Sequence, residues 1–563
     1  MPVNPAATFC ATLVEEWVGA GVSAAMVAPG SRSTPLALAL ADHPGIRLEV
    51  FHDERSAGFA ALGHGLATGQ PAVVLCSSGT AGTHFHAAVV EADLSSVPML
   101  VVTADRPPEL LDVGAAQTID QTRLFGHSVR WFHAPGPPDE QLSRTWRSLA
   151  RRSYRATVDT RPGPVHLNLA FREPLVGEAG PLPGGEPEVL AVSSPRLDLT
   201  SLEALVARMD RQRGVIIAGR GAGERSSDVD AVERLSSETG WPVLADPRSG
   251  CRHLDSAVWT ADALLRHEHF ARDHTPEVVL HIGDPWASRV TNEWLTSSGA
   301  YHVHLSALPR PLDPGHVMRQ WITAPVGPTC EWLATRLQGA RGTTWSSRWR
   351  NSERVAREAI AQALDGMQAL TEPTIARLVA SQVGPQQTVR NLVLSSSMPV
   401  RDVEWYAPVA VGARVYSNRG ANGIDGVIAT AIGVAAAVGP TVVLIGDVAF
   451  LHDSTSLTAL AHRGVDLRIV VVDNDGGGIF SFLSQASALP GERFEQLFGT
   501  PHGTDLEALC RAHHLPVVTA NDAESLLAAL QTAGPSVVLL RSERAANVVA
   551  HQRINRAVHD ALR

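Results

Sequence analysis

The sequence predicts three consecutive α/β domains, each with a central, mostly parallel sheet. At 563 residues the chain is too long for one core, and a domain size of about 150 residues gives three or four domains. Short apolar runs alternate with helix-like stretches, which is typical of βα units. A segment rich in Pro and Gly (177–195) and a helical stretch (343–364) divide this pattern. We therefore expect domains over 1–180, 190–342 and 343–563.

The overall composition is that of a folded protein with small-molecule partners. Hydrophobic residues make up 44% of the chain and charged residues 18%, which is ordinary for a globular protein. The formal net charge is −10, whereas proteins that bind nucleic acids or anionic membranes present basic surfaces. We therefore expect no nucleic-acid partner and no membrane partner.

Cysteine usage and the amino terminus predict a cytoplasmic protein. The five cysteines are scattered and form no CxxC pair, so we interpret them as reduced core residues: Cys10, Cys76, Cys251, Cys330 and Cys510. The first ten residues lack the basic start and apolar block of a signal peptide. The most apolar run (429–451) contains Gly439-Pro440 and Asp447, which indicates helix, turn and strand.

The sequence contains no lysine, so all 47 basic residues are arginine. This excludes a Walker A phosphate loop, a pyridoxal Schiff base and lysine-dependent aldolase chemistry. Any anion must therefore be bound by arginine side chains and backbone N–H groups.

In the first domain, four predicted strands end in polar or Gly-containing loops. The pairs of strand and loop are SAAMVA with PGSRST, IRLEVF with HDERSAG, AVVLCS with SGTAG, and PMLVVTA with DRPPE. Open α/β sheets bind ligands at the carboxyl edge of their strands. We therefore expect a ligand at this edge.

The second domain shows the same alternation. Its strand-to-loop signals are GVIIAGRGAG (214–223), WPVLAD (241–246), VVLHIGDP (278–285) and AYHVHLS (300–306). The GRGAG stretch matches a dinucleotide-binding loop only weakly, and a plain glycine turn is the favoured interpretation.

The third domain contains a strand–helix–strand unit. Two predicted strands, VVLIGD (442–447) and RIVVVDN (468–474), flank a segment in which Asp453 is a candidate N-cap and Gly464 a helix stop, with Leu457, Leu460 and Ala461 at helical spacing between them. Such a crossover makes the strands parallel, so Asp447 and Asn474 should emerge at one sheet edge.

A carboxylate, an amide oxygen and a glycine turn form a hard-oxygen site, which Mg²⁺ prefers when phosphate oxygens complete its shell. The carbonyl of Gly476 is a candidate third ligand. The alternatives are two solvated acidic turns or a hairpin at the Asp-Gly step. An EF-hand is excluded, because Ser484 occupies the position that requires glutamate.

The spacing from Gly446-Asp447 to Asn474 resembles the thiamine-diphosphate motif, although Val448 stands where that motif usually has glycine. Seven further segments together resemble the 2-succinyl-5-enolpyruvyl-6-hydroxy-3-cyclohexene-1-carboxylate synthase family of menaquinone biosynthesis: APGSRSTPL (28–36), DERSAGFAALG (53–63), SSGTAG (77–82), ADRPPEL (104–110), QTIDQ (117–121), SSSMPVRD (395–402) and SNRGANGIDG (417–426). The resemblance is specific in the first and third domains and diffuse in the second.

The resemblance implies the thiamine-diphosphate-enzyme fold and a transferase. The family decarboxylates 2-oxoglutarate and adds the resulting succinyl carbanion equivalent to isochorismate. The implied cofactors are thiamine diphosphate and Mg²⁺, with Mn²⁺ as a substitute. In related enzymes the first domain of one subunit and the third domain of another share one cofactor, so the resemblance implies a homodimer at minimum and a homotetramer as the expected state.

The resemblance also assigns roles to individual residues. Catalytic roles fall on Glu54, Arg32, Gln117, Arg401 and Arg419. Cofactor contacts fall on Glu54, Ile424, Gly446, Asp447, Asn474 and Gly476, of which the last three bind the metal. Substrate contacts fall on Ser31, Arg32, Arg106, Gln117, Arg289, Ser397, Arg401 and Arg419, with Ile479, Phe480 and Leu483 as an apolar wall. Ser288 and Ala116 depart from residues that some relatives carry.

Each assignment has a structural alternative. Glu54 could be an ordinary acid at a helix start, Ile424 could be a core residue, and a single arginine is usually a surface charge. At the level of function, the alternatives are another thiamine-dependent carboligase, similar to acetolactate synthase, and a noncatalytic nucleotide-binding protein that uses GRGAG.

Overall fold

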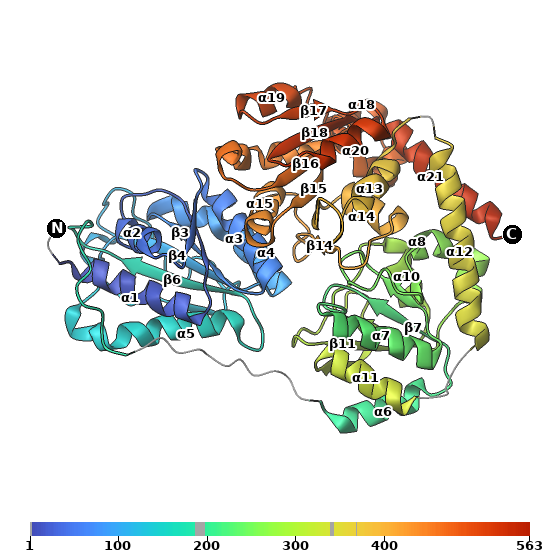
Figure 1. Ribbon diagram of the computed structural model, residues 1–563, viewed down its shortest axis with the longest axis horizontal. Coiled ribbons are helices and arrows are strands. Elements are labelled where there is room, and N and C mark those ends of the chain that lie inside the picture. Colours follow the sequence, from blue (N-terminus) through green and yellow to red (C-terminus); the bar gives the residue numbers. More distant parts are fainter. Residues whose placement is uncertain (1–2, 186–196, 338–342, 368) are drawn as a thin grey trace.

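The computed structural model describes residues 3–185, 197–337, 343–367 and 369–563. The described chain forms three α/β units, each with a six-stranded parallel sheet between helices (Figure 1). This confirms the predicted fold class. The predicted domain boundaries stay predictions, because they fall beside residues 186–196 and 338–342, which lie outside the described part. The end of the Pro- and Gly-rich segment also lies there.

The first sheet has the order β2-β1-β3-β4-β6-β5. Its strands are β1 (Ala24–Val27), β2 (Arg47–Val50), β3 (Ala72–Cys76), β4 (Met99–Asp105), β5 (Trp131–His133) and β6 (Pro164–Ala170). Its α-helices are α1 (Pro5–Ala20), α2 (Thr34–Asp42), α3 (Glu54–Thr68), α4 (His86–Ser95) and α5 (Trp146–Val158), with 3₁₀ helices η1 (Gly79–Phe85), η2 (Pro108–Leu110) and η3 (Glu140–Thr145).

The second sheet has the order β12-β11-β10-β7-β8-β9. Its strands are β7 (Gly214–Ala218), β8 (Val243–Ala245), β9 (Ala257–Val258), β10 (Val278–Ile282), β11 (Tyr301–Ser306) and β12 (Met318–Thr323). Its helices are α6 (Leu199–Met209), α7 (Ser226–Thr239), α8 (Ala261–Leu265), α9 (Glu268–Asp273), α10 (Arg289–Ser297) and α11 (Val326–Arg336).

The third sheet has the order β14-β13-β15-β16-β18-β17. Its strands are β13 (Asn391–Leu394), β14 (Arg414–Tyr416), β15 (Thr441–Gly446), β16 (Leu467–Asp473), β17 (Val517–Thr519) and β18 (Ser536–Arg541). Its α-helices are α12 (Thr343–Asp365), α13 (Glu372–Ser381), α14 (Met398–Tyr406), α15 (Val427–Val438), α16 (Asp447–His452), α17 (Gln485–Ala488), α18 (Gly491–Phe494), α19 (Leu506–Ala512), α20 (Ala523–Gln531) and α21 (Arg544–Ala561). The 3₁₀ helices η4 (Ser454–Leu457), η5 (Leu460–His462) and η6 (Gly478–Phe482) and the π-helix η7 (Glu495–Gly499) complete it.

The crossover between β15 and β16 differs from the prediction. The α-helix begins at Asp447 and ends at His452, and the segment that follows Asp453 forms only η4 and η5. Asp453 is buried, and its carboxylate accepts hydrogen bonds from the backbone N–H of Ala429 at 2.9 Å and from Ser456 Oγ at 2.7 Å. The side chain therefore ties this loop to α15, and the predicted helix from Asp453 to Gly464 is wrong.

The first and third domains are joined by helices that touch along their backbones. A Cβ on Gly63 of α3 would lie 2.1 Å from the carbonyl oxygen of Thr430, and one on Gly433 of α15 would lie 2.0 Å from that of Ala60. Only glycine allows this approach. The two helices and both sheets contribute to one shared core, so the two domains are firmly packed within a chain. In the described part of the chain, no helix is both long and apolar enough to cross a membrane.

Candidate active site

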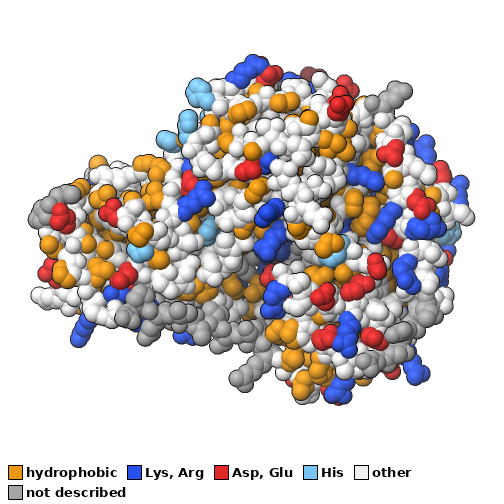
Figure 2. All heavy atoms as spheres, in the orientation of Figure 1, with side chains coloured by type: hydrophobic (Ala, Val, Ile, Leu, Met, Phe, Trp, Pro, Cys, Tyr) orange, Lys and Arg blue, Asp and Glu red, His pale blue; other side chains and the backbone are white. Residues whose placement is uncertain are grey.

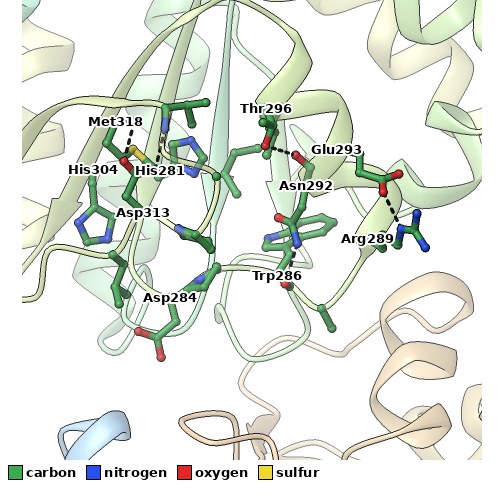
Figure 3. A pocket seen from close by; sticks show the side chains of 18 of the residues that line it. His281, Asp284, Trp286, Arg289, Asn292, Glu293, Thr296, His304, Asp313 and Met318 are labelled. Carbon is green, nitrogen blue, oxygen red and sulfur yellow. Dashed lines mark hydrogen bonds and ion pairs between the residues drawn. The ribbon is translucent and has the colours of Figure 1, made fainter.

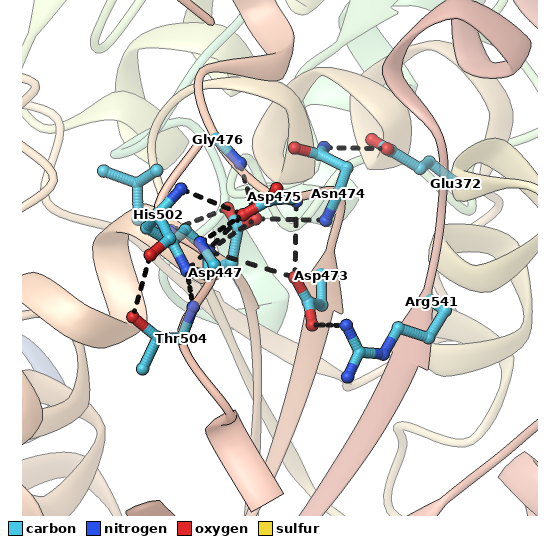
Figure 4. A network of polar contacts seen from close by, with 11 residues as sticks. Glu372, Asp447, Asp473, Asn474, Asp475, Gly476, His502, Thr504 and Arg541 are labelled. Carbon is cyan, nitrogen blue, oxygen red and sulfur yellow. Dashed lines mark hydrogen bonds and ion pairs between the residues drawn. The ribbon is translucent and has the colours of Figure 1, made fainter. Parts of the chain in front are cut away.

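Asp447 and Asn474 lie together at the carboxyl edge of the third sheet. β15 and β16 are parallel, with Gly446 opposite Val472, so the residues that follow them emerge side by side. Asp447 Oδ2 accepts the backbone N–H groups of Asn474 at 3.0 Å and Gly476 at 2.9 Å (Figure 4). The predicted juxtaposition at one sheet edge is confirmed.

The oxygen atoms at this edge are suited to a hard cation. Asp447 is buried, and burial raises the pKa of its carboxyl group. Asn474 Oδ1 is also buried and has no hydrogen-bond partner among the described residues, while its Nδ2 donates to Glu372 Oε1 at 3.0 Å. A carboxylate and a free amide oxygen are ligands of the kind that Mg²⁺ takes, so the residues present fit the implied metal.

The turn after Asn474 needs glycine for two reasons. Gly476 has a φ of +138°, and a Cβ there would lie 1.9 Å from the carbonyl oxygen of Gly499. Its own carbonyl oxygen accepts the N–H of Gly478 at 3.0 Å. A surface pocket of about 580 Å³ opens beside the turn and is lined by Asn474, Arg544 and Ser542 among others. Gly446 faces open space, since a Cβ there would meet nothing within 4 Å.

His502 and Asp473 also belong to this cluster, although neither was predicted as a site residue. His502 Nε2 lies 3.4 Å from Asp447 Oδ2 and 4.0 Å from Asp473 Oδ1. The three side chains could hold a metal ion together. The backbone N–H of His502 donates to Asp475 Oδ1 at 2.9 Å, which fixes the loop. His502 lies in an irregular segment far along the chain, so no sequence spacing could indicate it. Asp473 directly precedes Asn474, so the Asp-Asn-Asp run could have indicated it as a site residue.

The predicted substrate residues of the third domain gather close to the same edge. Ser397 has a φ of +74° at the start of α14, and its carbonyl oxygen accepts a hydrogen bond from Arg401 Nη1 at 2.6 Å. Burial, and then the charges of Arg248 and Arg401, lower the pKa of Arg419 to about 10. Arg248 comes from the second domain, was not predicted, and is paired with the carboxylate of Asp246 at 3.0 Å, so Arg401 and Arg419 are the arginines left for an anion. Closely spaced guanidinium groups favour a bound anion.

The first domain holds a second set of predicted residues at its own sheet edge. Arg32 is buried, donates to the carbonyl oxygen of Phe171 at 2.9 Å and pairs with Glu173 at 3.3 Å. Burial, and then the charge of Arg106, lower the pKa of Arg32. Gln117 is exposed, with its Nε2 donating to the carbonyl oxygen of Ser78 at 3.2 Å. Ser31 is exposed in the loop before α2.

Glu54 is the first residue of α3 and is half-buried. Its neighbours hold the helix start against the third domain of the same chain: Asp53 Oδ2 accepts from Thr455 Oγ1 at 2.7 Å, and Arg55 Nη2 donates to the carbonyl oxygen of His452 at 2.7 Å. Among the described residues, the Glu54 side chain has no hydrogen-bond partner. Its carboxylate is therefore free to bind a ligand.

Within the described ranges, no hydrogen bond or ion pair links Ser31, Arg32, Glu54, Arg106 or Gln117 to the predicted site residues of the third domain. Ile424, Ile479 and Phe480 are half-buried, and Leu483 is exposed. In the space-filling view, arginine side chains gather around a hollow where the three domains meet (Figure 2).

Arg289 stands apart in the second domain, at the start of α10. Its side chain is 81% exposed and pairs with Glu293 at 2.5 Å. Both residues line a pocket of about 510 Å³ together with Trp286 and His281 (Figure 3).

The GRGAG loop is packed rather than open. The sheet order reverses between β7 and β10, where a nucleotide would bind. A Cβ on Gly219 would lie 1.7 Å from the carbonyl oxygen of Asp284, and one on Gly283 would lie 2.0 Å from that of Arg220. The two loops are in backbone contact, so these glycines serve close packing, which favours the glycine-turn interpretation.

Models of known protein families match the chain in all three domains. Residues 8–124 match the family model described as thiamine pyrophosphate enzyme, N-terminal TPP binding domain. Residues 193–389 match the middle domain of thiamine pyrophosphate enzymes, and residues 403–541 match their C-terminal TPP binding domain. The edge with Asp447 and Asn474 therefore lies in a thiamine-diphosphate-binding domain.

Relatives with one shared name match nearly the whole chain. Proteins named 2-succinyl-5-enolpyruvyl-6-hydroxy-3-cyclohexene-1-carboxylate synthase are 41% identical in Myxococcus xanthus, 39% in Chloroflexus aurantiacus and 38% in Thermobifida fusca. The alignments cover 96%, 98% and 100% of this chain and 95%, 96% and 100% of those proteins. The chain belongs to this synthase family.

Of the residues that depart from the thiamine-diphosphate motif or from some relatives, Ser288 and Val448 have structural roles here. Ser288 is buried, caps α10 by accepting the N–H of Thr291 at 3.0 Å and donates to Asp262 Oδ2 at 2.6 Å. Val448 donates its backbone N–H to Asp447 Oδ1 at 2.7 Å, so it supports the carboxylate without needing glycine. Ala116 is exposed in the loop before Gln117.

Proposed function

We propose that this member of the synthase family decarboxylates 2-oxoglutarate and adds the succinyl unit to isochorismate, giving 2-succinyl-5-enolpyruvyl-6-hydroxy-3-cyclohexene-1-carboxylate and CO₂ in menaquinone biosynthesis. The names of the relatives and the thiamine-diphosphate-binding domains support this reaction. The observation that carries it is the buried, partnerless side-chain oxygen of Asn474, a residue whose backbone N–H donates to the Asp447 carboxylate, at the edge where the diphosphate would bind.

The cofactor would be held by residues from two sheet edges. Asp447, Asn474 and the carbonyl of Gly476 would bind Mg²⁺, or Mn²⁺ in its place, and Gly446 leaves room for the diphosphate. Ile424 would support the ring system. When bound, thiamine diphosphate supplies the nucleophilic carbon and the electron sink for decarboxylation. The Glu54 carboxyl would hold a proton against the aminopyrimidine nitrogen, which requires partial removal from water.

The arginines would bind the carboxylates of the two substrates. Each substrate carries two carboxylates, and a planar guanidinium can bind a carboxylate through two hydrogen bonds. Arg32 and Arg106 with Ser31 and Gln117 would act from the first domain, Arg401 and Arg419 with Ser397 from the third, and Arg289 from the second. Ile479, Phe480 and Leu483 would exclude water on the remaining side.

We further propose that the working unit is at least a homodimer, with a homotetramer as the expected state. The resemblance supports this, because in related enzymes the first domain of one subunit and the third domain of another share one cofactor. Domains over 1–180, 190–342 and 343–563 and a cytoplasmic location are proposed with it.

Turnover measurements test the reaction. We expect CO₂ release and the cyclohexene product from 2-oxoglutarate with isochorismate, and none from pyruvate alone. Turnover of pyruvate without 2-oxoglutarate would instead support the alternative, a carboligase similar to acetolactate synthase.

A further inference from the structure

We propose that Glu372 is a positioning residue that orients the Asn474 amide so that its oxygen is presented to the metal. This inference rests on the proposed function, in which Asn474 binds the metal. Glu372 is the first residue of α13 and is 4% exposed. Its Oε1 accepts hydrogen bonds from Asn474 Nδ2 at 3.0 Å and from Ser542 Oγ at 2.9 Å (Figure 4).

The hydrogen-bonding groups of Glu372 and Asn474 determine which end of the Asn474 amide faces Glu372. A carboxamide has a donor end and an acceptor end, and Glu372 Oε1 is the acceptor for both Asn474 Nδ2 and Ser542 Oγ. Because Glu372 is an acceptor, it selects the Nδ2 end of Asn474. The backbone N–H of Asn474 donates to Asp447, so the residue lies between the two carboxylates. The oxygen end must then turn away from Glu372.

Two further observations show that this orientation is built in. Asn474 Oδ1 is buried without a partner among the described residues, and a buried acceptor without a hydrogen bond destabilises the protein unless something binds it. A Cβ on Gly478 would lie 2.7 Å from Asn474 Nδ2, so a larger residue there would have to displace the amide from its present position. The amide is held by Glu372, and the oxygen is left for a ligand.

The simpler explanation is that Glu372 only stabilises the start of its helix. An acid in a first turn does so through the helix dipole. Here, however, both hydrogen-bond donors to Oε1 lie outside α13, one at the end of β16 and the other after β18. The carboxylate is directed at the sheet edge and acts on Asn474.

Binding of Mn²⁺ tests this role without relying on activity. The free-ion EPR signal is titrated with protein at saturating thiamine diphosphate, and melting curves verify the fold of each variant. Outer partners of metal ligands change metal affinity by about 10–100-fold. We expect Glu372→Leu to raise the Mn²⁺ Kd by about 10–100-fold, and Glu372→Gln to stay within about threefold because its amide oxygen still accepts.

Ser542→Ala is the matched control, because it removes the other donor to Oε1 and leaves the Asn474 contact. It should also stay within about threefold of the wild type. A Glu372→Leu variant that binds Mn²⁺ as the wild type does would overturn the inference, and so would an equal loss in Ser542→Ala. If the wild type does not bind Mn²⁺, the proposed function is wrong, and this inference fails with it.

A second pair of variants keeps the test decisive if Glu372→Leu does not fold. In Asn474→Asp, the new carboxylate has no N–H to donate to Glu372. Adding Glu372→Gln supplies a donor, so it should lower the Mn²⁺ Kd of Asn474→Asp by more than about threefold, although it changes little in the wild type. An equal effect of Glu372→Gln in both backgrounds would contradict a role through Asn474.

Discussion

Glu91 in α4 of the first domain holds the loop at Gly420 in the third domain. Its Oε1 accepts the N–H of Gly420 at 2.6 Å, and its Oε2 accepts that of Ala421, also at 2.6 Å. Ser95 Oγ donates to the same carboxylate at 2.6 Å, and Glu91 is buried. Because Arg419 precedes this loop, the first domain of a chain fixes the position of a predicted substrate arginine in the third.

Replacing Glu91 should therefore affect both stability and substrate binding. Hydrogen bonds to a charged group are worth about 1.5–3 kcal/mol each, so Glu91→Ala should lower the melting temperature clearly. It should also raise the KM for the substrates, because Arg419 loses its support. Ser95→Ala is the control, since it keeps the bonds to the loop. Equal KM values for wild type and Glu91→Ala would contradict the link to Arg419.

Glu54→Gln should separate cofactor binding from catalysis. The amide has the shape of the carboxyl group but cannot exchange its proton, so thiamine diphosphate should still bind. General acid–base groups contribute about 10²–10⁴-fold, and kcat should fall by that order. Calorimetry for binding and steady-state rates for turnover measure the two effects. A fully active Glu54→Gln enzyme would refute the proton role.

Mixing two inactive variants tests whether subunits share a site. In a dimer of Glu54→Gln and Asp447→Ala chains, a shared arrangement gives one doubly altered site and one intact site. With random pairing after co-expression, about a quarter of wild-type activity should return. If each chain had its own complete site, no activity would return.

The buried His166 should make folding sensitive to acid. Burial lowers the pKa of His166 to about 3, whereas the unfolded value is about 6.5. Below pH 6.5 the unfolded chain takes up a proton that the folded chain does not, so stability falls as the pH drops toward 3. This histidine adds at most about 1.4 kcal/mol per pH unit to that slope.

The comparison is between the wild type and His166→Gln, because all other titrating groups are the same in both. Urea unfolding between pH 6 and pH 4 should show a shallower loss of stability in His166→Gln. His166 Nε2 lies 2.8 Å from Thr103 Oγ1, a contact that glutamine can make as well. If the free energy of unfolding falls equally with pH in both proteins, His166 does not cause the loss of stability in acid.

The sequence predicted the sheets better than the details of the site. Strand-to-loop signals placed Asp447 and Asn474 at one edge because parallel strands force their ends together. Arg248 and His502 could not be predicted, since they reach the site from another domain and from an irregular loop. Asp453 was predicted as the N-cap of a helix, but its carboxylate binds the backbone of α15 instead, a contact that is distant in sequence. Glu372 acts through a hydrogen bond to Asn474 across 102 positions, which no local pattern indicates.

Calorimetric titration with thiamine diphosphate, with and without Mg²⁺, tests the central claim most directly. The wild type should bind the coenzyme only when Mg²⁺ is present, and Asp447→Ala should lose this binding while keeping its fold, since the carboxylate is a metal ligand. Mg²⁺-dependent binding of equal affinity in Asp447→Ala would contradict the assignment of this sheet edge to the metal and diphosphate.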